Sequence, residues 1–553
     1  MFEDFLDNQG HTHEGPVPKL GVIFFSESSP LTFALEELQR SDRRSLYDPI
    51  SQINVEANAQ RTTHPPHMSP QDTAYLHAKG AFETVNSETS ASLVSAFLDR
   101  FYPLYSIVDK DSFVELHEKQ ALPWVLLHAV SFIGATFCDA STIHKAGFKS
   151  RWHARRCFYD KAKILFDVGY ETNKVVLLQT VLMLSFWGPQ MKSYWNPCSW
   201  IGFGVTIAES LGINRRNPAT WIEPKSKSLL RRLWWTLAVR DAYCAALLGR
   251  PFRINISQCD TDMLELIDFD HSVTCPGTDC HTHYMYQIQI AKLSLLLRKI
   301  IQVRFGPPNH GTTLQDLHET SHRWRAELPP EVDWSFHSAS SNIFATCLCI
   351  IFNHHLIFIH LEKPSFGDDF GTEPQQDSSS FQMAQSAAQK IASTALSLMT
   401  NSKVEQLPHE TFPGFFIAGI VFYRQFRQSQ QSVYAQLGRA ALDNCQMVMN
   451  EARERWDPAL WAIKIFDFLL SRTNNTTKTP APSNWQEGPV HGSGTLGTEL
   501  SQQILDNPEI EGVLDKNILH SIDFESPQFE DMNRTLDDFF CIPSYFGAAP
   551  DSW

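Results

Sequence analysis

The sequence predicts an all-α protein, in which a body of many helices lies between two irregular acidic ends. Apolar residues recur at helical spacing in long runs between residues 90 and 473. Proline and glycine interrupt these runs at short intervals, as at Pro103, Pro123 and Gly212. No set of short alternating segments indicates a sheet in this region. We therefore expect one helical body, 90–473, whose helices are joined by short turns.

The N-terminal region, residues 1–89, differs from the body in composition. It is rich in Ser, Thr, His and Pro, lacks sustained periodicity, and holds 13 acidic and 6 basic residues. Segments of this kind bury too little apolar surface to fold. We predict that 1–89 is disordered, apart from a short helix at Leu31–Leu46. The acidic start, MFEDFLDNQG, lacks the basic region of a signal peptide, so we expect a protein that is not secreted.

Two apolar segments of the body resemble membrane spans in composition but not in length. Leu122–Cys138 and Ile343–Phe352 are shorter than the ~20 apolar residues that a span requires. We predict buried core helices at both places and no contact with a membrane. Another helix is expected to begin at Asn196-Pro197, since Asn caps helices and Pro suits their first turn, and to end at Gly212.

The C-terminal region combines a linker, 474–498, with an acidic tail, 499–553. The linker is polar and rich in Pro and Gly. Together they hold 13 acidic and 3 basic residues, so the two ends carry −7 and −10, and the body between them is near neutral at +2 within the net charge of −15. In the tail, as in the N-terminal MFEDFLD, acids alternate with bulky apolar residues, which is typical of segments that bind partner proteins. The tail residues expected to make such activation-type contacts with a partner are Phe524, Phe529, Phe539 and Phe540.

No metal site or catalytic site emerges from the sequence. A six-cysteine, two-zinc cluster needs two CxxC pairs, and CxxC occurs nowhere in the chain. We interpret Cys275–His283 as an ordinary loop, and His354, His355 and His360 as core residues. No GxGxxG follows a predicted strand, and neither GxxxxGK[ST] nor GxSxG is present. We therefore expect no metal, no cofactor and no enzymatic activity. The 11 cysteines lie mostly in apolar runs, which is typical of reduced intracellular thiols.

A set of basic residues between 145 and 163 is a candidate binding site. On one continuous helix these residues would share a face. One interpretation is an ordinary solvated face; the other is a dock for something acidic, either phosphate or the protein's own tail. The residues of this basic set are Lys145, Lys149, Arg156 and Lys163.

The segment 229–254, LLRRLWWTLAVRDAYCAALLGRPFRI, is apolar but carries charges that point in different directions. A surface helix gathers its charges on one face. Here they lie roughly a quarter-turn apart, so we predict a helix that is buried on every side, with its charges paired inside the protein. The expected pairs join Arg232, Arg240 and Arg250 to Asp241 and to Asp260 or Asp262.

This segment resembles the signature of the fungal-specific transcription factor domain, the middle homology region of zinc-cluster regulators. The stretches at 97–113 and 207–218 resemble further elements of that domain, and 146–171 is similar to its cutinase transcription factor branch. The resemblance covers about 90–300. Its signature residues, for which we expect a structural role, are Arg231, Arg232, Trp234, Trp235, Arg240, Asp241, Gly249, Arg250, Pro251 and Asp260.

The resemblance implies a helical regulatory domain in a nuclear regulator of transcription that controls the genes of one pathway. Its partners would be the transcription machinery or co-regulator proteins, and it could form a homodimer or a heterodimer with a related regulator. The family also implies a zinc cluster that binds DNA, but residues 1–90 contain no cysteine. We therefore expect only indirect contact with DNA.

Three alternatives remain open from the sequence. The first is a zinc-cluster DNA-binding factor whose DNA-binding exon is missing from this sequence. The second is an all-α module that binds small molecules or acts as an enzyme. The third concerns the signature segment alone, which could line a ligand-sensing pocket instead of being purely structural.

Overall fold

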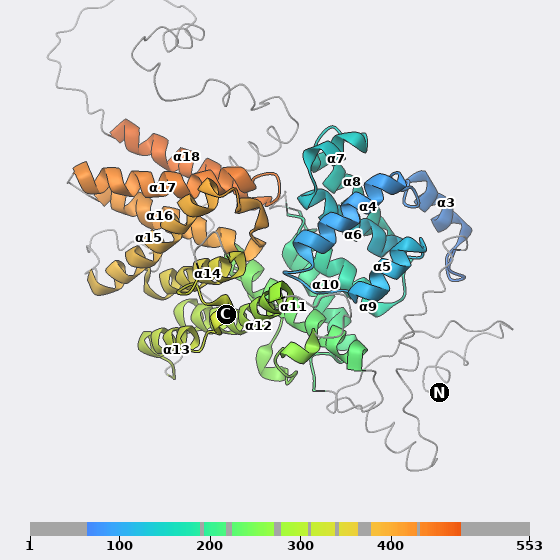
Figure 1. Cartoon of the computed structure of the whole chain (residues 1–553), viewed down its shortest axis with the longest axis horizontal. Helices are drawn as coiled ribbons and strands as arrows, with labels where there is room; N and C mark the ends of the chain where they lie inside the picture. Colours follow the sequence, from blue (N-terminus) through green and yellow to red (C-terminus); the bar gives the residue numbers. More distant parts are fainter. Residues whose placement is uncertain are drawn as a thin grey trace, which may run out of the picture. The chain divides into compact units, whose positions relative to one another are not determined.

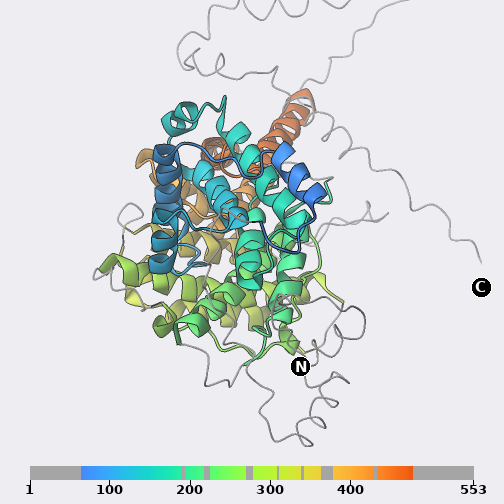
Figure 2. The same ribbon diagram turned by 90° about the vertical axis from the view of Figure 1, so that its right-hand side faces the viewer.

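The computed structural model describes residues 64–188, 193–216, 224–269, 278–307, 311–337, 342–362, 378–428 and 432–476. These residues form helices joined by turns, and no strand occurs among them (Figures 1 and 2). The predicted all-α class is confirmed. The α-helices are α3 (Pro70–Ala78), α4 (Ser87–Ala96), α5 (Lys110–Glu118), α6 (Trp124–Phe137), α7 (Ala140–Lys145), α8 (Arg151–Asp167), α9 (Lys174–Leu184), α10 (Pro197–Ser210), α11 (Pro224–Leu248), α12 (Thr278–Phe305), α13 (Leu314–Ala326), α14 (Ile343–His360), α15 (Ser378–Thr400), α16 (Phe412–Gln428), α17 (Ser432–Ala452) and α18 (Pro458–Thr476). Shorter turns are η1 (Phe97–Phe101), η2 (Ile256–Gln258), η3 (Leu266–Asp268), η4 (Pro330–Val332), η5 (Val404–Gln406) and η6 (His409–Thr411).

The described residues fall into two compact units, which we consider separately. The first unit ends at Ala462 and contains α3 to α17 with the start of α18, and the second begins at Ile463. Within the first unit, α6 packs against α4, α8 and α9 (Figure 1), while α11 packs against α9, α10 and α12. Further along the chain, α14, α15, α16 and α17 pack on one another.

The structured body begins earlier than the sequence predicts. Residues 64–89, predicted to be disordered, include α3 (blue in Figures 1 and 2) and the start of α4. The side chain of Ser69 caps α3 by accepting a hydrogen bond from the N–H of Asp72 at 3.1 Å, and Pro70 follows in the first turn. Leu76 of α3 is fully buried in a cluster with Val125 and Leu165. Leu76 and Ala81, with Met68 and Phe82 packed against the same cluster, thus order a segment whose composition alone indicated disorder.

Several predicted segments lie outside the described residues. These are the helix at Leu31–Leu46, the linker from residue 477 onward and the acidic tail, 499–553. The predicted end of the body, 473, falls inside α18, which continues to Thr476.

The two apolar segments are core helices, as predicted. Nearly every residue of α6 is buried, including His128, whose Nε2 lies 2.7 Å from the carbonyl oxygen of Ala81. In the described part of the chain, α14 is the one helix long and apolar enough to cross a membrane, and 72% of it is buried inside the protein. It is longer than the predicted apolar segment, because Asn353 and the histidines after it do not interrupt the helix.

The start and end of α10 confirm the capping signals in the sequence. The side-chain oxygen of Asn196 accepts hydrogen bonds from the N–H groups of Cys198 at 3.0 Å and Ser199 at 3.3 Å. Gly212 follows the last turn with a φ of +67°, in the left-handed region that glycine enters at little cost.

The crossing of α6 and α4 depends on Gly134. A Cβ atom at this position would lie 2.3 Å from the carbonyl oxygen of Leu93. We expect Gly134→Ala to lower the free energy of unfolding by about 1–3 kcal/mol, since the helices would have to move apart. The matched control is Gly202→Ala in α10, where a Cβ would meet nothing within 4 Å. Urea denaturation of both variants tests this, and equal stabilities would contradict it.

Candidate functional site

The signature helix α11 is enclosed by the fold, as its charge pattern predicts. Arg232, Arg240 and Asp241 are all buried, and so are the tryptophans Trp234 and Trp235. The charges cannot reach water and must therefore find partners inside the protein.

Arg240 forms the centre of a buried cluster that joins three distant parts of the chain. Its guanidinium donates hydrogen bonds to Oε1 of Glu410 at 3.1 Å and to the carbonyl oxygen of Ser185 at 2.8 Å. It also lies 3.8 Å from the ring centroid of Phe186. The hydroxyl of Tyr105 donates to the second oxygen of Glu410. Burial, followed by the charge of Glu410, raises the pKa of Tyr105 well above its usual value, so that the phenol remains a donor.

Asp241 fixes the turn that follows α11. Its carboxylate accepts hydrogen bonds from the backbone N–H groups of Arg253 and Ile254, both at 3.0 Å. Arg298 of α12 pairs with it at 2.8 Å and also donates to the carbonyl oxygen of Ala238. Asp241 therefore joins α11, α12 and the turn.

The structure corrects the predicted pairing. Arg240 pairs with Glu410 and Asp241 with Arg298, and neither pairs with the predicted partner. Asp260 and Asp262 instead pair with Arg215 and Arg216. Arg250 is exposed. Glu410 and Arg298 could not be predicted as the partners, because each lies far along the chain in a segment without a distinctive pattern.

The remaining signature residues have structural contacts. Arg231 pairs with Asp268 at 2.8 Å, and the indole N–H of Trp235 donates to the carbonyl oxygen of Asp262 at 2.8 Å. The guanidinium of Arg232 lies 5.9 Å from the ring centroid of Phe269. Gly249 ends the helix with a φ of +61°, and Pro251 follows it on the surface.

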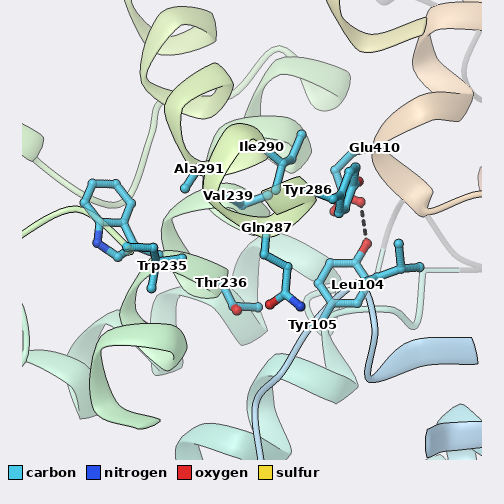
Figure 3. A pocket seen from close by; sticks show the side chains of 11 residues that line it. Leu104, Tyr105, Trp235, Thr236, Val239, Tyr286, Gln287, Ile290, Ala291 and Glu410 are labelled. Atoms are coloured by element: carbon cyan, nitrogen blue, oxygen red, sulfur yellow. Dashed lines mark hydrogen bonds between the residues drawn. The ribbon is translucent and has the colours of Figure 1, made fainter. Parts of the chain in front are cut away.

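A small pocket lies beside this network (Figure 3). In that view Trp235 lies at one end of the lining, and Tyr105 with Glu410 lies at the other. Val239, Ile290 and other apolar side chains form the walls. The cavity measures about 10 Å³, which is about the space that one water molecule needs. A larger ligand would have to displace side chains, so the pocket does not favour the ligand-sensing alternative.

The basic set is not one helical face. Lys145 ends α7, Gly147 turns the chain with a φ of +84°, and Lys149 lies in the loop before α8. On α8, Arg156 pairs with Asp160 at 3.5 Å, and Lys163 pairs with Asp167 four residues along the helix. The prediction of a shared face is therefore wrong.

His354 and His355 of α14 are core residues, as predicted, whereas His360 is only half-buried. Burial lowers the pKa of His354 to about 3, so its ring is neutral at physiological pH. His355 is fully buried, with Nε2 3.2 Å from the hydroxyl of Tyr243. Nε2 of His360 lies 3.0 Å from Nδ1 of His318.

No group of three or more His, Cys, Asp or Glu side chains in the described ranges is arranged to hold a metal ion. The start of the Cys275–His283 segment lies outside those ranges, but the residues from Thr278 onward begin α12, so the interpretation of the segment as a loop is wrong for them. The cysteines whose side chains are described are free thiols.

Comparison with known proteins places these features in a family. Residues 94–445 match the family model of the fungal specific transcription factor domain. The chain is 25% identical over 477 residues to cutinase transcription factor 1 alpha of Fusarium vanettenii, which covers 82% of this chain and 50% of that protein. It is 28% identical over 214 residues to cutinase transcription factor 1 beta of the same organism, covering 38% of this chain and 24% of that protein.

A third relative is the acetamidase regulatory protein of Aspergillus fumigatus. The identity is 24% over 388 residues, covering 68% of this chain and 47% of that protein. The chain thus spans about half or less of the length of these curated relatives. Because the domain model matches more than half of the chain, this protein belongs to the fungal specific transcription factor domain family.

Proposed function

We propose that this protein is a nuclear regulator of transcription that works through protein contacts made by its helical body and its acidic tail. The observation that carries the proposal is the match of the transcription factor domain to residues 94–445. The relatives support it, since they are named as transcription factors and as a regulatory protein. Two of these names refer to cutinase and one to acetamidase, which favours control of the genes of a particular pathway.

In this proposal the helical body is a scaffold, and the acidic tail recruits other proteins. The buried ion pairs hold the body in one arrangement, and the tail offers Phe524, Phe529, Phe539 and Phe540 to co-regulators or to the transcription machinery. Neither role requires a cofactor or catalysis. A homodimer or a heterodimer with a related regulator is compatible with it.

A reporter assay tests the proposal. The full chain, fused to a heterologous DNA-binding module, should activate a reporter gene, and deletion of 499–553 should abolish activation. Replacing the four tail phenylalanines by alanine should remove most of the activity. Replacing them by leucine is the matched control and should retain most of it, because the apolar bulk is preserved. Full activity without the tail would contradict the assigned role.

The chain itself should bind DNA only weakly and without sequence preference. It has no CxxC pairs for a zinc cluster, and its net charge is −15. In a gel shift, any binding should vanish at modest salt, because it would depend on a few phosphate contacts. Nanomolar, base-specific binding would instead favour the alternative of a DNA-binding factor. Since the relatives are longer, a zinc cluster encoded elsewhere in the gene remains part of that alternative.

A further inference from the structure

The turn after α11 exposes two arginines, Arg250 and Arg253. No acidic residue occurs between Asp241 and Asp260 in the sequence. Asp241 is buried and already engaged by Arg298 and two backbone N–H groups. Among the described residues, no carboxylate pairs with either exposed arginine. The turn therefore presents positive charge that no carboxylate in the described ranges pairs with.

The backbone of this turn is held rigidly. Arg250 donates its N–H to the carbonyl oxygen of Ala245 at 2.9 Å, which closes the end of α11. Arg253 donates its N–H to Asp241 at 3.0 Å. Between them, the ring of Phe252 lies 4.7 Å from the guanidinium of Arg298. Side chains on a fixed backbone lose less entropy on binding than those on a mobile loop.

The charges of Arg250 and Arg253 both influence the pKa of one thiol, that of Cys198. Burial raises the pKa of Cys198, at the start of α10, and the charges of Arg250 and then Arg253 oppose that rise. The next acids along the chain, Asp260 and Asp262, already pair with Arg215 and Arg216.

The surface also includes apolar groups, because Leu247, Leu248 and Phe252 are half-buried and Pro251 is exposed.

We propose that Arg250 and Arg253 form a docking surface for an acidic segment of a partner protein, in which carboxylates alternate with bulky apolar residues. The carboxylates would pair with the guanidinium groups, and the apolar residues would cover the adjacent apolar side chains. A nucleic acid fits less well, since binding through phosphates typically uses six to ten basic contacts and this surface offers two. The inference rests on the proposed function, and it adds the chemistry of the partner.

Fluorescence anisotropy with the full chain tests the docking surface. The probe is a labelled peptide of four Asp-Phe-Glu-Ser repeats, and its control has Asn and Gln in place of Asp and Glu. We expect the acidic peptide to bind more tightly than its control and to dissociate as salt is raised. The double variant Arg250→Gln/Arg253→Gln should weaken binding about three- to tenfold, since exposed ion pairs contribute modestly. The matched variant Arg323→Gln/Arg427→Gln removes two exposed arginines elsewhere and should not weaken it.

The outcomes separate this inference from the proposed function. Equal weakening in both double variants, or equal binding of the two peptides, would overturn the docking surface while the reporter assay could still succeed. Binding of a DNA duplex that depends on Arg250 and Arg253, without peptide binding, would overturn it in favour of a phosphate site. Melting curves of the variants should match the unmodified chain, because neither side chain is buried.

Discussion

Replacing Glu410 by alanine should lower the free energy of unfolding by about 3–5 kcal/mol. The substitution would leave the buried guanidinium of Arg240 without its counter-charge and the hydroxyl of Tyr105 without its acceptor. Breaking one side of a buried ion pair has a cost of this size, because the remaining charge stays in a poorly solvated environment. Urea denaturation followed by tryptophan fluorescence measures the effect.

The double variant Arg240→Met/Glu410→Leu is the control for that result. It removes both charges and keeps apolar volume, so it should cost clearly less than the sum of the two single substitutions. If Glu410→Ala left the unfolding midpoint unchanged, Glu410 would not be the internal partner of Arg240. Its place at the pocket would then point to a role in ligand binding instead.

Asp241→Ala should also destabilise the body by about 3–5 kcal/mol, whereas Arg250→Ala should change stability by no more than about 0.5 kcal/mol. Asp241 neutralises Arg298 and accepts two backbone hydrogen bonds in the buried turn. Arg250 is exposed and pairs with no described carboxylate. Substitution of an exposed residue without such a partner changes the free energy of unfolding little. Thermal melting of the two single variants makes the comparison.

The contrast between these two variants is the informative measurement. The sequence analysis places both residues in one buried network, and in that case both substitutions would destabilise and the double variant would cost less than their sum. The structure predicts instead that Asp241→Ala destabilises the body strongly and that Arg250→Ala hardly changes its stability. In the double variant the two effects should add. A large destabilisation by Arg250→Ala would restore the single network and would remove the basis of the docking surface.

Local signals in the sequence were sufficient for the fold class and for much of its detail. The cap at Asn196, the stop at Gly212 and the buried helix α6 depend on residues close together in the chain, which is why short patterns reveal them. Residues 64–89 show the limit of composition. Their apolar residues, Leu76 and Ala81 among them, pack in a cluster with Val125 of α6 and Leu165 of α8, which the composition of the segment does not indicate.

The sequence was sufficient to predict that the charges of the candidate site are buried, but not which charges pair with one another. The charges spread around α11 correctly indicated burial on all sides. Their partners could not be found, because Glu410 lies 170 residues after Arg240 and Arg298 lies 57 residues after Asp241. The prediction that the basic set shares one helical face was wrong for a different reason. The helical spacing assumed an unbroken helix, and the left-handed turn at Gly147 separates Lys145 from α8.

The distance in sequence between Arg240 and Glu410 has a consequence for the synthesis of the protein. At ~5–20 residues per second, about 10–30 s pass between the emergence of Arg240 and that of Glu410 from the ribosome. During this time Arg240 has no carboxylate to neutralise its charge. The buried cluster around Arg240 therefore cannot be completed until nearly the whole body has been made. A chain that ends before Glu410 would lack this partner, and we expect it to be less stable than the complete body.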